Sequence, residues 1–212
     1  MSDPKWLVWA NQIRSIARAG LTYTEGPFDR ERYEHLQAIA AEMLAAGSDS
    51  AFEPVRDLLK NEVGYLTPKV DVRGVVFNEA GKLLLVQEHQ DHDLWTLPGG
   101  WADVYDSPSE AVTREVREEA GYETRATKLL AVWDRDRHGH PPHPDYIYKL
   151  FFRCEITGQL AAQVQAANLE TGGVAFFGED EIPPLSLGRT MPHQITRLFE
   201  HYRGPNLPTD FD

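Results

Sequence analysis

The sequence has little cysteine, no long apolar run and a shortage of positive charge. Its 212 residues include a single cysteine, Cys154, so no disulfide can form within the chain. That cysteine stands in the alternating segment YIYKLFFRCEI, which favours a small buried side chain over a catalytic thiol. No apolar run approaches the ~20 residues of a membrane helix, and the N-terminal residues lack the features of a signal peptide. We therefore expect a cytoplasmic protein.

The scarcity of positive charge bears on the partners of the chain. Lys and Arg together number 21 against 33 Asp and Glu, which gives a formal net charge of -12. Such a charge repels long polyanions, so it argues against nucleic acid as the main partner. A small phosphate-bearing molecule stays compatible with it, provided that divalent cations lie between the phosphate oxygens and the carboxylates.

Residues 1–66 are predicted to form a helical domain. Apolar residues from Trp6 to Leu21 recur at spacings of three and four, as one face of a helix requires. A second helix should follow Gly26 and Pro27, with Asp29 as its N-cap and Gly47 as its terminator, and a short third helix should span residues 54–60. Helices with single apolar faces must pack on other parts of the chain or on a second copy, and Trp6 and Trp9 on the first helix favour association.

Residues 67–212 are predicted to form a second domain of strands and turns. The segments VDVRGVVF and KLLLVQEH flank a turn at residues 78–81 and together indicate a β-hairpin. The segment RDRHGHPPHPD, residues 135–145, is too rich in proline for regular structure. We expect an α+β fold in which helices cover a mixed sheet. Further strands are predicted at residues 95–97, 129–134, 146–156 and 174–177, and a helix at residues 191–203.

One predicted helix gathers three carboxylates. Ser107 as N-cap, Pro108 at the first helical position and Glu110 in a capping box define its start, and Gly121 defines its end. Valine and alanine residues spaced four apart form a buried face. The other face carries Glu115, Glu118 and Glu119.

Two interpretations compete for these carboxylates. They form either a solvated face paired locally with Arg114 and Arg117, or a site for a hard divalent cation that offsets their mutual repulsion. The preceding segment LWTLPGGWADVYDSP favours the cation, because Gly99 and Gly100 permit close backbone approach to a ligand and leave carbonyl oxygens available.

These residues together resemble the Nudix box. Gly100, Arg114, Glu115, Val116, Glu118, Glu119 and Gly121 match its fixed positions at the family's spacing. Two positions depart from it: Asp106 stands where the box has its first glutamate, and Tyr122 stands where it usually has an aliphatic residue. The shorter Asp106 puts the structural salt bridge of that glutamate in question. The helical N-terminus and the segments GYLTPKVDVRGVVF and FFGEDEIPPLSLGR resemble one Nudix branch that carries an N-terminal helical domain.

The resemblance implies a fold, an activity and a metal. It implies an α/β/α sandwich with a mixed sheet, a homodimer, and hydrolysis of the diphosphate in ADP-ribose or CDP-choline type substrates with Mg²⁺ or Mn²⁺. It assigns the metal to Glu115, Glu118, Glu119 and the Gly99 carbonyl, and it makes Arg114 the residue that orients the carboxylates. The general base is either Glu119 or Glu170, since Nudix enzymes take it from the box helix or from a distant loop.

Signals for the rest of the substrate are weaker. Arg73 and Lys149 are candidates to meet phosphate and Trp133 to stack on a base, although each is also compatible with a structural role. The histidines of residues 135–145 lack the regular spacing of zinc ligands, so a loop that lines the substrate is the better interpretation. A non-catalytic nucleotide-binding module and an enzyme acting on RNA ends remain as alternatives.

Overall fold

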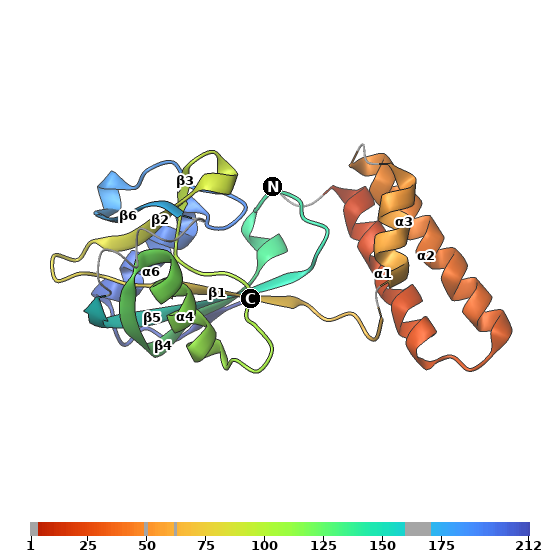
Figure 1. The fold of residues 1–212 in the computed structure, drawn as a ribbon, viewed down its shortest axis with the longest axis horizontal. Helices are drawn as coiled ribbons and strands as arrows, with labels where there is room; N and C mark the ends of the chain where they lie inside the picture. The colour runs from red at the N-terminus through yellow and green to blue at the C-terminus, as the bar shows by residue number, and fades with distance from the viewer. Residues whose placement is uncertain (1–3, 49–50, 62, 160–170) are drawn as a thin grey trace. The chain divides into compact units, whose positions relative to one another are not determined.

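The computed structural model describes residues 4–48, 51–61, 63–159 and 171–212 (Figure 1). These residues fall into two compact units. The first comprises Met1–Pro68 with Pro142–Tyr146, and the second comprises Lys69–Pro141 with Ile147–Asp212. Within the described ranges, no helix has both the length and the apolar character needed to cross a membrane.

The first unit is helical. Its helices are α1 (Lys5–Tyr23), α2 (Pro27–Gly47) and α3 (Phe52–Asn61), as the spacing of apolar residues predicted (Figure 1). Helix α2 packs against both of the others. A buried side chain also ties α2 to α3, because Gln37 Nε2 donates to the Leu59 carbonyl at 2.7 Å. The core of this unit consists of Leu7, Ala10, Ala40, Ala41, Leu44 and Leu59.

The predicted cap of α2 is wrong by three residues. Gly26 occupies the N-cap position and Pro27 starts the helix, whereas Asp29 lies in the first turn. Its carboxylate still contributes there, since a negative charge near a helix N-terminus is favourable. It also pairs with Arg32 at 2.7 Å one turn later.

The second unit contains two sheets. The four-stranded sheet has the order β1 (Lys69–Val75), β5 (Ile147–Gln159), β4 (Tyr122–Asp134) and β7 (Asp210–Phe211). It is mixed, because β1 runs parallel to β5 while β4 runs antiparallel to it. The three-stranded sheet is antiparallel, with the order β3 (Leu94–Thr96), β2 (Leu83–Glu88) and β6 (Thr171–Phe177). The mixed sheet is as predicted.

The predicted hairpin of β1 and β2 is wrong in its pairing. The turn forms as expected, since the Asn78 side chain accepts from the amides of Ala80 and Lys82, both at 3.0 Å. Beyond it only an isolated bridge joins Phe77 to Leu83, and the two strands then enter different sheets. A turn signal in the sequence predicts the reversal of the chain but not the partner of each strand.

Alternate residues of the central strands face two cores. On one side, Val72, Val76, Leu84 and Val86 pack against helix α4 (Pro108–Ala120) and Cys154, which is buried as expected. On the other side, Val75, Leu83, Leu85 and Phe151 pack against helix α6 (Pro192–Arg203). Strands buried on both faces between helices make up the α/β fold of this unit.

The loop of residues 135–145 is more regular than predicted. Residues Arg135–His138 form a short 3₁₀ helix, η2, which the Asp134 side chain caps by accepting from the Asp136 amide at 3.1 Å. The prolines begin only at Pro141, so they do not prevent this turn. Two further 3₁₀ turns, η1 (His89–Asp91) and η3 (Glu179–Glu181), lie in the same unit.

Candidate active site

Helix α4 holds the predicted site on a well-capped frame. The Ser107 side chain accepts from the Glu110 amide while the Glu110 carboxylate accepts from the Ser107 amide, which is the predicted capping box. Gly121 ends the helix in the left-handed conformation with a φ of 72°. Because Val112 and Val116 are fully buried, the orientation of the helix about its axis is fixed. The carboxylates on its other face are therefore held in place.

Arg114 connects two carboxylates of the preceding loop with two carboxylates of the helix. Its guanidinium donates to Glu115 at 2.8 Å, to Glu118 at 3.2 Å and to Asp106 at 3.1 Å. It also lies 3.2 Å from Asp103. The shorter Asp106 therefore still makes an ion pair with Arg114, so the departure from the box leaves this contact intact.

A turn formed by residues 97–100, the glycine turn, lies against β1. The Gly74 amide donates to the Pro98 carbonyl and the Val72 amide to the Gly100 carbonyl, both at 2.8 Å. Gly99 has a φ of 146°, and a Cβ at this position would lie 2.0 Å from the Val72 carbonyl oxygen. Only glycine fits there, because both the conformation and the space exclude a side chain.

The glycine turn contacts two of the box carboxylates. The Gly99 amide donates to Glu119 Oε2 at 2.8 Å. A Cβ on Gly100 would lie 3.1 Å from Glu115 Oε2, so that carboxylate rests against the glycine backbone. The two glutamates, one turn apart on α4, thus meet consecutive residues of the turn.

Burial makes these carboxylates hard to ionise in the protein alone. Desolvation raises the pKa of Glu119 to about 8, against the opposing effects of Arg73 and of the Gly99 hydrogen bond. Desolvation likewise raises the pKa of Glu115, although Arg114 opposes it. A nearby cation would favour the ionised form of these buried carboxyls. Carboxylate oxygens are suitable ligands for a hard divalent ion such as Mg²⁺ or Mn²⁺.

The side chains are not arranged as a complete metal cage. Within the described ranges, no three His, Cys, Asp or Glu side chains converge closely enough to hold a metal ion. Glu118 is half exposed and lies 3.2 Å from Arg114 and 3.5 Å from Arg117, while Glu119 is turned to the Gly99 amide. The assignment of a metal to Glu115, Glu118, Glu119 and Gly99 stays a prediction.

The three predicted substrate contacts lie in the interior. Arg73 and Lys149 are 3% and 1% exposed, and both contact the buried carboxylate of Asp71. Trp133 is 5% exposed and packs between Phe151 and the His138 ring. In this structure none of the three presents its functional group to solvent, and their predicted role stays untested.

Two buried carboxylates near the site were missed by sequence reasoning. Asp71 lies opposite Lys149 in the parallel pairing of β1 with β5. Glu88, at the end of β2, is 7% exposed, lies 3.4 Å from Arg189 Nε, and acts electrostatically on both Arg73 and Glu119. A charged residue inside an otherwise apolar strand was a signal for both, since buried carboxylates need partners.

Two other predicted features are placed differently. Glu170, the alternative general base, lies outside the described residues. Each of the three loop histidines has its own partners. His138 contacts His193 and Asp212, His140 is buried against the Leu187 carbonyl, and His143 contacts Asp145.

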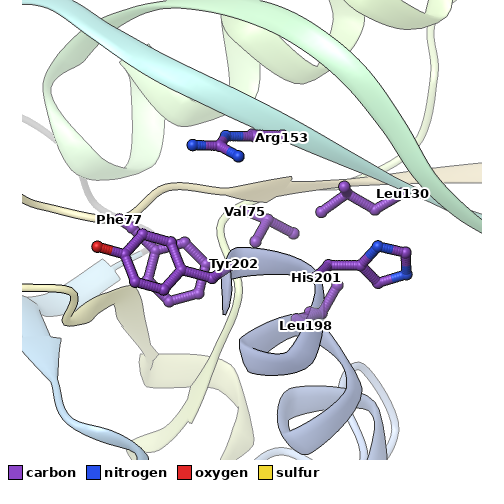
Figure 2. Close-up of a pocket in the computed structure, with 7 residues that line it drawn as sticks. All are labelled: Val75, Phe77, Leu130, Arg153, Leu198, His201 and Tyr202. Atoms are coloured by element: carbon purple, nitrogen blue, oxygen red, sulfur yellow. The ribbon is translucent and has the colours of Figure 1, made fainter. Parts of the chain in front are cut away.

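A small cavity lies away from the carboxylates, between the four-stranded sheet and α6. Figure 2 shows its lining, which comes from strands β1, β4 and β5, from the turn after β1 and from α6. Its volume is about 10 Å³, which is close to the minimum for one water molecule. It is therefore too small for a nucleotide. The lining residues are Val75, Phe77, Leu130, Arg153, Leu198, His201 and Tyr202.

Comparison with known proteins identifies two domains in the chain. Residues 67–198 match the NUDIX domain, and residues 4–59 match a UDP-X-like N-terminal oligomerisation domain. YjhB of Bacillus subtilis (strain 168), a candidate ADP-ribose pyrophosphatase, is 47% identical over 98% of this chain and 97% of its own. The ADP-ribose pyrophosphatase of Methanocaldococcus jannaschii is 33% identical over 62% of this chain and 73% of its own.

Solved structures agree with these relatives. The crystal structure of a UDP-X diphosphatase is 35% identical and covers all of both chains with a TM-score of 0.61. That of an ADP-ribose pyrophosphatase from Streptococcus suis is 37% identical, with a TM-score of 0.59 over 69% of this chain and all of its own. With its capped box helix, its glycine turn and a domain match over residues 67–198, the chain belongs to the Nudix family and is a Nudix pyrophosphohydrolase.

Proposed function

We propose that the protein hydrolyses the diphosphate of a nucleoside diphosphate joined to a second group, with ADP-ribose or a UDP-linked compound as substrate. The observation that carries this proposal is the contact of Glu119 and Glu115 with consecutive glycines of the glycine turn. This contact places two partly buried carboxylates directly against the backbone of the glycine turn. Acidic, oxygen-rich sites of this kind suit phosphate chemistry when a divalent cation screens the charges.

The residues of the chain divide the chemistry among them. Water attacks one phosphorus, the bond to the bridging oxygen breaks, and a nucleoside monophosphate leaves with the phosphorylated second group. Glu119 is the proposed acceptor of the water proton, because it is the more deeply buried of the two box carboxylates that contact the glycine turn. Arg114 holds Glu115 and Glu118 in orientation.

A divalent cation is proposed as cofactor. Glu115 and Glu119 would hold it, with Glu118 and the Gly99 carbonyl as further ligands. When bound, it would neutralise charge on the phosphate oxygens and lower the pKa of a bound water. The buried carboxylates support this assignment, because burial favours their neutral forms in the absence of a cation.

The substrate class follows from the relatives. Proteins named for ADP-ribose and for UDP-X hydrolysis are both similar to this chain, and the UDP-X diphosphatase covers its full length. None of the relatives described above is named for CDP-choline, which stays a prediction to be tested beside the others. A diphosphate that links a nucleoside to another group is common to all three.

A substrate panel tests this proposal. ADP-ribose, UDP-sugars, CDP-choline, dinucleoside polyphosphates, nucleoside triphosphates and a triphosphate-ended RNA are incubated with Mg²⁺, with Mn²⁺ and with chelator. Glu119→Gln is the inactive variant, and Glu123→Gln, an exposed glutamate just beyond the helix, is its matched control. Reaction in ¹⁸O-labelled water then shows which product carries the label and hence which phosphorus is attacked.

The outcomes separate the alternatives. Metal-dependent cleavage of one linked nucleoside diphosphate, lost in Glu119→Gln and kept in Glu123→Gln, supports the proposal and names the substrate. Cleavage of the RNA end alone would move the assignment to RNA processing. Tight nucleotide binding without turnover of any compound would contradict the proposed activity.

We also propose that the protein is a homodimer assembled through its first unit. Residues 4–59 match an oligomerisation domain. Helix α1 leaves Trp9 and Ile16 exposed, at 54% and 59%, and their spacing of seven places them on one face of the helix. Exposed apolar residues that share a face are typical of association surfaces.

A further inference from the structure

A buried charge cluster lies beside the glycine turn. Its members are Asp71, Arg73 and Lys149, which are 6%, 3% and 1% exposed. Arg73 Nε and Nη2 donate to the two oxygens of Asp71, each at 2.8 Å, and Lys149 Nζ lies 3.0 Å from Asp71 Oδ1. The register of β1 with β5 pairs Asp71 with Lys149, so the sheet itself sets this arrangement.

Arg73 also reaches the glycine turn. Its Nη1 donates to the Leu97 carbonyl at 3.1 Å, two residues before Gly99. The backbone bonds from Gly74 to Pro98 and from Val72 to Gly100 attach the same turn to β1. The guanidinium therefore links the four-stranded sheet to the glycine turn. The Gly99 amide of the same turn donates to the Glu119 carboxylate.

The donors of Arg73 leave little for a substrate. All three guanidinium nitrogens already donate to protein oxygens, two of them in a paired geometry that fixes the plane of the group. The side chain is also closed off from solvent, so a phosphate could reach it only after the turn moved. Its charge acts on the Glu119 carboxylate, which is its electrostatic partner in the site.

We propose that Arg73 is a positioning residue for hydrolysis, which orients the glycine turn so that the Gly99 amide holds Glu119 where the cation and the water are needed. Asp71 fixes the plane of the guanidinium, and Lys149 holds Asp71 from the neighbouring strand. This inference deepens the proposed function and rests on it. The partners of liganding groups commonly have such a role, since they hold the ligands in the geometry that the metal requires.

The test uses the full-length protein and two readouts. Arg73→Lys keeps the charge but cannot make the paired contact with Asp71 and the third bond to Leu97 together. Arg125→Lys is the matched control, because this exposed arginine of β4 pairs only with Glu155, at 3.3 Å, in the contacts described. Mn²⁺ affinity is measured by electron paramagnetic resonance without substrate, and kcat and KM are measured on the substrate found by the panel.

We expect Arg73→Lys to lower kcat, Mn²⁺ affinity or both by about 10- to 100-fold, with KM at the wild-type value. The Gly99 amide resonance, observed by ¹H–¹⁵N correlation, should shift in the same variant, while Arg125→Lys should match the wild type in every readout. Asp71→Asn, which keeps the side-chain volume, should change each readout in the same direction.

Three results bear on the inference separately from the activity. Unchanged Mn²⁺ affinity with a raised KM would mean that Arg73 touches the substrate, which overturns the positioning role. A Gly99 resonance at its wild-type position in folded Arg73→Lys would overturn it as well. Weaker Mn²⁺ binding and a shifted Gly99 resonance in a protein that cleaves no diphosphate would support the positioning role and contradict the proposed function. If Arg73→Lys does not fold, Asp71→Asn decides by the same readouts.

Discussion

At the scale of single residues, Glu119 shows a conflict between stability and activity. Its carboxylate is held by the Gly99 amide in a site where burial favours the neutral form. The role proposed above needs the charged form in the presence of a cation. In that role the residue would serve activity at some cost to the stability of the cation-free protein.

Glu119→Gln is expected to separate these two effects. The amide oxygen of glutamine can accept the same hydrogen bond from Gly99 without carrying a charge. We expect kcat to fall by about 100- to 10,000-fold, as for loss of a general base. In chelator the variant should be at least as stable as the wild type, which urea unfolding would measure. A clearly less stable variant would mean that the carboxylate has another favourable partner in the folded protein.

A second residue, His140, should make stability depend on pH. It is 3% exposed; its Nδ1 lies 2.7 Å from the Leu187 carbonyl and its Nε2 lies 3.3 Å from Gln194 Nε2. A neutral ring that donates to the carbonyl and accepts from the Gln194 amide satisfies both contacts. Desolvation, with smaller effects of Lys149 and Arg135, lowers the pKa of His140 to about 3.

The sign of this effect follows from the lowered pKa. In the unfolded chain His140 is protonated below about pH 6.5, whereas in the folded protein it stays neutral down to about pH 3. Its contribution to the free energy of unfolding is therefore complete above pH 6.5 and is lost as the pH falls toward 3. Between pH 8 and pH 5 the loss should be about 2 kcal/mol. Urea unfolding gives the free energy of unfolding of wild type and His140→Asn at both pH values. The drop from pH 8 to pH 5 should be about 2 kcal/mol larger in the wild type. An equal drop in the two proteins would contradict the prediction that His140 is buried in its neutral form.

At the scale of elements, α4 is stabilised by its own ends. Its first turn has a serine cap with a reciprocal glutamate, and its last residue is followed by a left-handed glycine. These local contacts do not involve the carboxylates to which we assign the chemistry. Changes at the ends of the helix should therefore alter the free energy of unfolding more than the activity.

Gly121→Ala tests the C-terminal end of α4. At a φ of 72° alanine should lower the free energy of unfolding by about 1 kcal/mol relative to glycine, because a Cβ is crowded by the backbone in the left-handed conformation. Gly188→Ala is the matched control, since a Cβ there meets nothing within 4 Å and its φ lies outside the left-handed region. That change should be neutral or slightly stabilising. Urea unfolding of both variants gives the comparison, and equal effects would show that the cap contributes little.

At the scale of the whole molecule, the two units are expected to serve assembly and chemistry respectively. The first matches an oligomerisation domain and the second a NUDIX domain. A dimer formed through the first unit would make the melting temperature depend on protein concentration, because association stabilises only the folded state.

Replacing Trp9 and Ile16 together by arginine tests that assembly. We expect the double variant to be monomeric by light scattering and to melt at a temperature that does not change with concentration, since two charges would be buried in the interface. Ile156→Arg, at an exposed position of β5 in the second unit, is the control and should leave the mass unchanged. A double variant with wild-type mass would place the interface elsewhere.

Several elements of this molecule could be predicted from residues that are close together in the sequence. The α4 helix follows from Ser107, Glu110 and Gly121, whose contacts all lie within one or two turns of the chain. The grouping of the box carboxylates on one face of that helix follows in the same way, because their spacing is fixed on one rigid helix. Their assignment to a metal stays a prediction. The first two helices of the first unit were also predicted from their apolar spacing, although the N-cap of α2 was placed at the wrong residue.

The remaining features depend on contacts between residues far apart in the sequence. Local periodicity could not show that β1 pairs with β5 instead of β2, or that Asp71 meets Lys149 across that pairing. The contact of Arg73 with Leu97 and that of Gly99 with Glu119 likewise form only once strands and helix are packed. Local patterns define helices and turns because their bonds are local, whereas strand partners and buried charges are set by the packing of the whole unit.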